Sequence, residues 1–141
     1  MSELARKLGI RVGDPICLIG ANAEAEAALR SELPEGVHIT RNPRERRFPT
    51  ILFWPTELGG LTERFKELQA CILPNGAVWA VMPKKAFAQA RGIAFSWSQM
   101  QAAALQTDLV DNKEASFSAQ EYATRFVIRK DRREKTSLGR G

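Results

Sequence analysis

Lys84 and Lys85 are the side chains in this sequence best placed to bind a small anion. They follow the apolar run AVWAVM of residues 77–82, from which Pro83 separates them. Lysine ammonium groups attract phosphate and carboxylate, and Pro83 has no backbone N–H to offer such an anion. A ligand at this position would therefore be held by the two lysine side chains. The alternative is that both lysines are simply solvated where the strand ends.

Small and polar residues also follow the other apolar runs of the sequence. Ligands of open α/β sheets bind beyond the carboxyl ends of the strands, close to the point where the strand order reverses. The strand exits predicted here contain Gly20, Asn22 and Thr56. We expect these residues to share a ligand-binding crevice with Lys84 and Lys85.

Two short segments are strongly basic. The loop RNPRERR, residues 41–47, holds four arginines against one glutamate, and residues 129–141 hold six basic side chains against two acidic ones. Such patches bind nucleic acid through its phosphates, with an affinity that falls steeply with salt. The alternative is a solvated surface, because we expect no exposed aromatic side chains beside either patch. The arginines of the candidate nucleic-acid site are Arg41, Arg44, Arg46 and Arg47.

The sequence gives little support for nucleophilic or metal chemistry. His38 is the only histidine, and no serine or cysteine stands at a recognisable spacing from it. Cys17 and Cys71 lie in apolar patterns without the spacing of metal ligands, so we expect two free, buried thiols. We therefore predict neither a catalytic residue nor a metal site.

Apolar runs alternate with helix-forming segments along most of the chain. Ser96 and Gln99 form a capping box, which marks the start of one helix. The run at 77–82 is apolar at every position, which indicates a strand buried on both faces, as in a parallel sheet. Pro74, Asn75 and Gly76 predict a β-turn that reverses the chain just before it. Strands are predicted at 16–20, 37–40, 50–54 and 77–82, and helices at 2–9, 23–33, 58–72 and 96–106.

The last third of the sequence predicts an antiparallel hairpin. Residues 109–117 and 122–130 are predicted to be two strands on either side of a turn at 118–121. In the register that this turn gives, Glu114 faces Arg125. The fold predicted for residues 1–130 is a single three-layer α/β domain with a mostly parallel sheet that ends in this hairpin. Residues 131–141 contain one apolar side chain and are predicted to be a basic, disordered tail.

Four segments resemble a known family. They are LARKLGIRVGDPICLIG at 4–20, LPNGAVWAVMPKK at 73–85, LVDNK at 109–113 and TRFVIRK at 124–130. They are similar to a bacterial family of small proteins of unknown function with a truncated, Rossmann-like form of the class I S-adenosylmethionine-dependent methyltransferase fold. The resemblance implies a reduced sheet of that type and brings no established activity.

The resemblance adds one group of candidate ligand residues. It suggests that Asp111, Asn112 and Lys113 join Lys84 and Lys85 in a polar cluster. The alternative is a turn in which the side chains of Asp111 and Asn112 bond to their own backbone.

The motifs that hold S-adenosylmethionine in such enzymes are missing from this sequence. ANAEAE follows Gly20 in place of a glycine-rich loop. Thr40 and Arg41 stand where a carboxylate usually holds the ribose hydroxyls at the end of the second strand. We therefore expect no cofactor, with S-adenosylmethionine as the alternative.

Three functions are consistent with these features. The first is a non-catalytic binding or regulatory module whose partner is an unidentified protein or small molecule. The second is a methyltransferase or other small-ligand enzyme, and the third is a weak nucleic-acid-binding protein. The sequence has no apolar run of about 20 residues and no apolar signal-peptide core near Met1, so we expect a cytoplasmic protein without a membrane partner.

Overall fold

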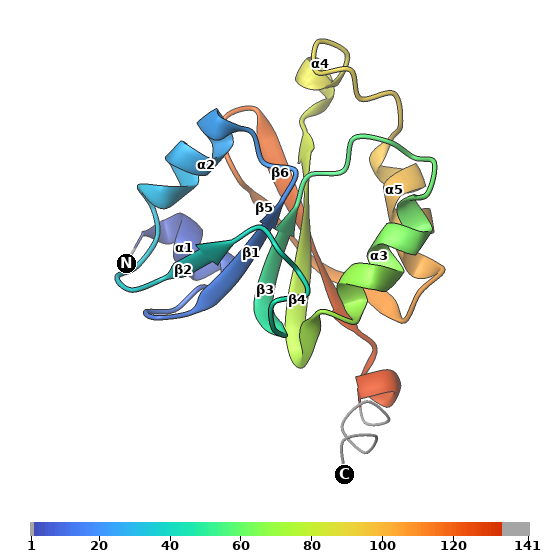
Figure 1. Ribbon diagram of the computed structural model, residues 1–141. Coiled ribbons are helices and arrows are strands. Elements are labelled where there is room, and N and C mark those ends of the chain that lie inside the picture. Colours follow the sequence, from blue (N-terminus) through green and yellow to red (C-terminus); the bar gives the residue numbers. More distant parts are fainter. Residues whose placement is uncertain (1, 134–141) are drawn as a thin grey trace.

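The computed structural model describes residues 2–133, which form a six-stranded sheet with helices on both faces (Figure 1). The strand order is β2-β1-β3-β4-β6-β5. Pairing is parallel from β2 to β4 and antiparallel from β4 through β6 to β5. The strands are β1 (Pro15–Ile19), β2 (His38–Thr40), β3 (Phe48–Phe53), β4 (Ile72–Pro83), β5 (Leu109–Ser116) and β6 (Glu121–Ile128).

The helices complete a three-layer arrangement. Figure 1 shows α1 and α2 on one face of the sheet, α3 and α5 on the other, and the short α4 beyond one end. The predicted α/β fold with a mostly parallel sheet and a C-terminal hairpin is confirmed. The helices are α1 (Glu3–Leu8), α2 (Ala23–Arg30), α3 (Leu61–Gln69), α4 (Lys85–Ala88) and α5 (Trp97–Leu105).

Helix starts follow the predicted caps. The Ser2 hydroxyl accepts a hydrogen bond from the backbone of Ala5 at 3.1 Å. Ser96 and Gln99 form the complete capping box of α5. These side chains satisfy backbone N–H groups that have no partner within the first helical turn, and thereby fix where each helix begins.

Strand β4 is buried on both faces, as its apolar sequence predicts. Val78, Ala80 and Met82 belong to the core beneath α3 and α5. Ala77 and Trp79, which alternate with them, belong to the core beneath α1 and α2. Because side chains alternate between the faces of a strand, a fully apolar run can fill both cores at once.

The chain does not reverse at residues 74–76, so the predicted β-turn is wrong. Ile72 pairs with Phe48 and Ala77 pairs with Thr50, both in parallel register, so the intervening residues form an irregularity within one long strand. A Cβ atom at Gly76 would lie 2.9 Å from the carbonyl oxygen of Phe48. The glycine is therefore explained by close packing of the bulge on β3.

The predicted pairing of Glu114 with Arg125 is also wrong. The backbone N–H of Phe117 donates to Glu121 at 3.0 Å and Ser116 pairs with Tyr122, so the turn is one residue shorter than predicted. Lys113 therefore lies opposite Arg125, and Glu114 lies opposite Thr124. A separate register shift between Asp111 and Lys113 lies farther from the turn and does not determine the partner of Glu114.

The prediction for the two cysteines is confirmed, whereas most of the predicted tail is outside the described residues. Cys17 and Cys71 are free and buried, as predicted. Burial, and to a lesser extent the neighbouring Cys71, raises the pKa of Cys17 to about 12, so its thiol is protonated at neutral pH. Residues 130–133 of the basic segment form a helical turn, and the rest of the predicted disordered tail, 134–141, lies outside the described residues.

Replacement of Gly76 tests the packing of the bulge. Gly76→Ala should lower the free energy of unfolding by about 1–3 kcal/mol, because the new methyl group must displace backbone atoms of β3. Urea denaturation measures this loss. Gly59→Ala is the control, since no atom lies within 4 Å of a Cβ placed there. Equal stability of the two variants would contradict this explanation of Gly76.

Candidate functional site

Five strand ends meet at one edge of the sheet, which we call the carboxyl edge. It contains the carboxyl ends of the four parallel strands β1 to β4 and the amino end of β6, where Glu121 lies opposite Pro83. Strand order reverses at β1, which has β2 on one side and β3 on the other. Open α/β sheets bind ligands at such a reversal.

Glu121 is a buried carboxylate at this edge. It is only 6% exposed, and its Oε2 atom accepts two hydrogen bonds. One comes from the Trp54 indole Nε1 at 3.1 Å and the other from the Arg91 guanidinium Nη2 at 2.9 Å. A buried carboxylate is stable only when charged or polar partners compensate its lost hydration. Trp54 and Arg91 supply that compensation from two different loops.

A cavity of about 570 Å³ lies between α2 and the β5–β6 turn, and we call it the α2 groove. Its size is in the range of small-molecule sites. Its walls include the apolar side chains of Leu4, Ala25, Ala28, Leu29 and Phe117. The Phe117 ring packs edge to face on Trp54, with ring centroids 5.6 Å apart, so the groove wall continues into the Glu121 network.

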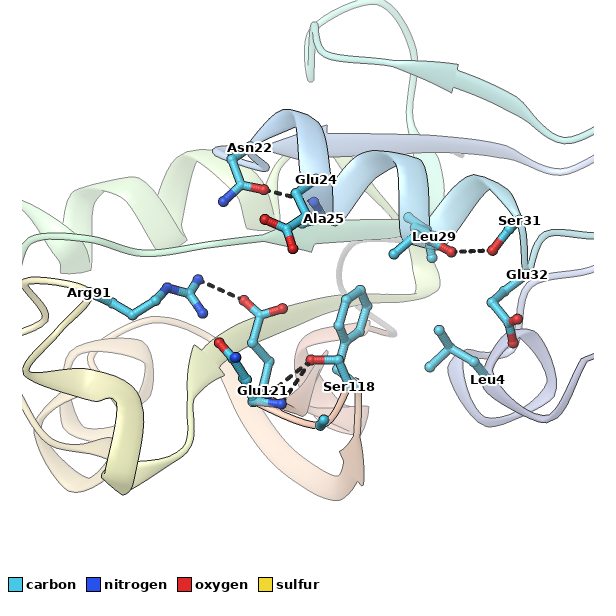
Figure 2. Close-up of a pocket in the computed structure, with 14 residues that line it drawn as sticks. Leu4, Asn22, Glu24, Ala25, Leu29, Ser31, Glu32, Arg91, Ser118 and Glu121 are labelled. Atoms are coloured by element: carbon cyan, nitrogen blue, oxygen red, sulfur yellow. Dashed lines mark hydrogen bonds and ion pairs between the residues drawn. The ribbon is translucent and has the colours of Figure 1, made fainter.

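Polar side chains gather at one end of the α2 groove. Figure 2 shows Asn22 and Glu24, at the start of α2, facing Arg91 and Glu121 across the cavity. The Asn22 side-chain oxygen caps α2 by accepting from the backbone of Ala25 at 2.7 Å, which leaves its amide N–H groups for other partners. Together with Glu32 farther along, the lining holds three carboxylates and one guanidinium. Such a groove suits a ligand with an apolar body and a positively charged end.

Gly20 is at the carboxyl edge, where the sequence predicts it, but its environment explains it without a ligand. Its φ angle is +86°, and a Cβ there would lie 2.8 Å from the carbonyl oxygen of Trp54. Trp54 also donates its backbone N–H to Ile19 at 2.8 Å. The glycine therefore allows the chain after β3 to pack closely against the end of β1.

The predicted crevice residues are divided among separate cavities. Gly20 and Thr56 line a cavity of about 350 Å³, while Asn22 lines the α2 groove. Lys84 and Lys85 line neither of these two cavities. The backbone N–H of Lys84 donates to Gln120 at 2.7 Å, so it belongs to the sheet edge. The sequence predicts a single crevice for these residues. In the structure, α2 and the loop after β3 that contains Trp54 divide this region into separate cavities.

Asp111, Asn112 and Lys113 do not join Lys84 and Lys85 in a polar cluster. The register places Asp111 opposite Phe126, which in turn lies opposite Val78, near the middle of β4. Lys113 donates to the backbone oxygen of Lys7 at 3.3 Å. Asp111 accepts from Gln101 at 3.0 Å, and Asn112 from Arg125 at 3.3 Å. These side chains therefore have structural partners some distance from the carboxyl edge.

Two of the four arginines in the basic loop are held in ion pairs. Arg41 pairs with Glu26, and Arg44 donates to Glu67 at 2.8 Å. The hydrogen bond from Arg44 is the main reason that the pKa of Glu67 lies below its ordinary value. This pairing lowers the charge available for phosphates. Among the four loop arginines, Arg46 and Arg47 have no ion pair or side-chain hydrogen bond within residues 2–133. The nucleic-acid interpretation stays a prediction.

Sequence reasoning missed Glu121 and Arg91. A signal for Glu121 existed, because strand alternation puts it on the same face as Ala123 and Val127, which are buried. Arg91 had no such signal. It lies in a turn after α4, and its contact with Glu121 spans 30 residues of sequence.

No protein-family model matches the chain, and no curated protein matches it. Solved structures do match in fold. A TehB-like S-adenosylmethionine-dependent methyltransferase from Corynebacterium glutamicum superposes with a TM-score of 0.59 at 10% identity, covering 92% of this chain and 89% of its own. N-methyltransferase NodS from Bradyrhizobium japonicum gives 0.56 at 11% identity, with coverages of 89% and 92%.

A third match comes from an archaeal complex. A chain of the complex between the Haloferax volcanii Trm112 methyltransferase activator and the putative methyltransferase gives a TM-score of 0.61 at 9% identity, covering 89% of this chain and 86% of its own. At these identities the matches concern the fold alone. The protein has the Rossmann-like fold of S-adenosylmethionine-dependent methyltransferases. The resemblance to a family of small bacterial proteins gains no support from these comparisons.

Residues 2–133 contain neither a metal-ligand cluster nor a membrane-spanning helix. No group of three or more His, Cys, Asp or Glu side chains there is arranged to hold a metal ion. No helix in the same residues combines the length and apolar character needed to span a membrane.

The Arg91–Glu121 pair can be tested by a double-mutant cycle. Arg91→Ala should lower the free energy of unfolding by about 1–3 kcal/mol, because it leaves the buried Glu121 carboxylate with one donor fewer. In the Glu121→Gln background the loss should be smaller, giving a coupling of about 0.5–3 kcal/mol by urea denaturation. Arg46→Ala, at an exposed position, should change stability by less than about 0.5 kcal/mol. An equal cost of Arg91→Ala in both backgrounds would show that the pair does not hold the edge together.

Proposed function

We propose that this protein is a binding or regulatory module that holds a positively charged small molecule in the α2 groove. The observation that carries the proposal is the buried Glu121 carboxylate at the polar end of that groove. Even a paired carboxylate loses hydration when it is buried, and an apolar residue would pack there without that cost. A binding role gives a reason for a carboxylate at the polar end of an otherwise mostly apolar groove.

The surroundings of Glu121 favour binding over catalysis. A general base must be free to take a proton from its substrate. The Oε2 atom of Glu121 is already engaged by Trp54 and Arg91, which fix the side chain in one orientation. Glu24, the other carboxylate at this end, lies at the exposed start of α2. We infer that Glu121 orients the ligand and that Glu24 adds negative charge at the opening.

An S-adenosylmethionine-dependent methyltransferase is the second candidate, favoured by the fold of the solved methyltransferases. The residues present do not fit the usual way of holding that cofactor. The backbone of Trp54 closes on Gly20, where the cofactor would approach the end of the first strand. Arg41, paired with Glu26, occupies the position of the carboxylate that would hold the ribose. We therefore derive no step through this cofactor.

Protein partners are a separate question. The Haloferax volcanii activator is a partner of that methyltransferase. A protein partner for this chain stays a prediction, as does a cytoplasmic location.

Two probes of opposite charge test the α2 groove. Tryptamine and indole acetate share an aromatic body and differ in the sign of the charged end. Tryptamine should raise the unfolding temperature, with a stabilisation approaching about 2.7 kcal/mol at a hundredfold its dissociation constant, and indole acetate should not. Thermal unfolding at constant ionic strength measures both.

Two neighbouring substitutions on α2 provide the matched control. Ala28 is exposed and lines the α2 groove, whereas Ala27 is exposed and lines a cavity on the other side of the helix. Ala28→Trp should abolish the effect of tryptamine, and Ala27→Trp should leave it intact. Equal stabilisation by both probes, or an equal loss in both variants, would overturn the assignment of the groove.

The methyltransferase alternative is tested by its cofactor. Millimolar S-adenosylmethionine or its demethylated product should leave the unfolding temperature of the protein unchanged, because neither Gly20 nor Arg41 is arranged to hold it. Isothermal titration calorimetry checks the same expectation without heating the cofactor. A clear stabilisation by either compound that survives Ala28→Trp would favour the methyltransferase over the binding module.

A further inference from the structure

The side of α2 opposite the α2 groove carries a second, basic cavity. It has a volume of about 360 Å³ and lies beyond the carboxyl ends of β1 and β2. Its lining consists of three alanines and three charged residues, namely Ala21, Ala23, Ala27, Glu26, Arg30 and Arg41. Because the alanine side chains are short, the charged groups border an open space.

Glu26 holds both arginines of this cavity in place. Arg30 donates to Glu26 Oε2 through Nε at 3.2 Å and approaches it through Nη2 at 3.1 Å. Arg41 donates to the other oxygen, Oε1. Burial opposes ionisation of Glu26, but the hydrogen bonds and charges of Arg30 and Arg41 outweigh it, so the pKa of Glu26 lies below its ordinary value. The carboxylate therefore stays ionised at neutral pH and keeps the two guanidinium groups together.

Both guanidinium groups retain unused donors. Each guanidinium carries five N–H donors, and their contacts with Glu26 involve two nitrogens of Arg30 and one of Arg41. The side chains of Arg30 and Arg41 are 55% and 65% exposed, so a ligand can reach these donors. Two arginines against one glutamate leave the cavity with a net positive charge.

We propose that this cavity binds the phosphate group of a small phosphorylated molecule. Planar guanidinium groups match the oxygens of a phosphate and bind it through paired hydrogen bonds. The location supports the same conclusion. Dinucleotide-binding sheets hold a ribose at the end of the second strand with a carboxylate, and an arginine at that place accommodates a phosphate on the ribose instead. Arg41 immediately follows β2.

This site is independent of the α2 groove. Residues of α2 three or four positions apart share one face of the helix. Ala23, Glu26, Ala27 and Arg30 line the basic cavity, whereas Ala25, Ala28 and Leu29 line the groove. The phosphate site can therefore be correct if the groove binds nothing, and the reverse also holds.

Adenosine monophosphate, with adenosine as its uncharged counterpart, tests the phosphate site. Isothermal titration at constant ionic strength should show binding of adenosine monophosphate and none of adenosine, with inorganic phosphate as a competitor. Arg41→Gln should weaken binding about tenfold or more, because it removes charge-assisted hydrogen bonds. Arg46→Gln, an exposed arginine of the same loop, should change the affinity by less than about twofold.

A second pair of variants does not disturb the arginines. Ala27→Trp should block adenosine monophosphate by filling the cavity, and Ala28→Trp should not. The pattern is therefore the inverse of that expected for tryptamine in the groove. Unfolding temperatures near that of the unmodified protein show that the variants are folded.

Three results would overturn the proposal. The first is equal binding of adenosine and adenosine monophosphate, and the second is no binding of adenosine monophosphate at millimolar concentration. The third is an equal loss in Arg41→Gln and Arg46→Gln accompanied by tight binding of a single-stranded oligonucleotide. That last result would assign the arginines to a nucleic-acid surface.

Discussion

The carboxyl edge depends on the burial of one charge, that of Glu121. The end of β6, the loop after β3 and the turn after α4 meet at this side chain through Trp54 and Arg91. The Trp54 and Phe117 rings also pack edge to face, so apolar contact joins the loop after β3 to the β5–β6 turn. The turn after α4 reaches this edge through the ion pair of Arg91 with Glu121. If the buried carboxylate lost either donor, it would need hydrogen bonds from water in place of that donor, which requires the edge to open. The edge is therefore closed by electrostatic compensation of Glu121 in addition to apolar packing, whereas the rest of the sheet is held by apolar packing.

Helix α2 determines how the closed edge is divided. Its period of 3.6 residues sends Glu24 toward the side of Glu121 and Glu26 toward the side of Arg41. An acidic groove and a basic cavity therefore lie on opposite sides of one two-turn helix. Since alanines occupy most of the intervening positions, the helix leaves space on both sides. From the sequence alone, residues 23–30 indicate only a segment of strong helix formers with scattered charges.

The parts of the fold that depend on local pattern could be predicted from the sequence. The doubly buried β4 and the capping box of α5 are set by residues that are neighbours in the chain. The turn expected at Pro74 to Gly76 failed because its local preference was outweighed by pairing of both flanking segments with β3. The Glu114 register failed because the β5–β6 turn is one residue shorter than predicted, and turn length sets every partner along a hairpin.

The candidate site was less predictable because its contacts are long-range. Gly20, Asn22 and Arg41 were placed correctly at strand ends, yet which of them share a cavity depends on the path of α2. Glu121 and Arg91 meet across 30 residues, and Trp54 and Glu121 across 67. A sequence pattern describes the neighbours of a residue along the chain, and these partners come from segments whose relative position only the folded sheet determines.

The shared fold does not by itself bring methyltransferase chemistry to this chain. A fold places strand ends at one edge, and the side chains at those ends decide what can bind there. Gly20 shows the distinction, since a glycine follows the first strand, as in many nucleotide-binding sheets, but here it accommodates the carbonyl oxygen of Trp54. Arg41 shows it in electrostatic terms, because a guanidinium at the end of β2 attracts an anion where a carboxylate would receive hydroxyl groups. The same sheet geometry is thus compatible with an anionic group in place of neutral ribose hydroxyls. The charge of the group bound at the end of β2 therefore separates the phosphate-site interpretation from the methyltransferase interpretation.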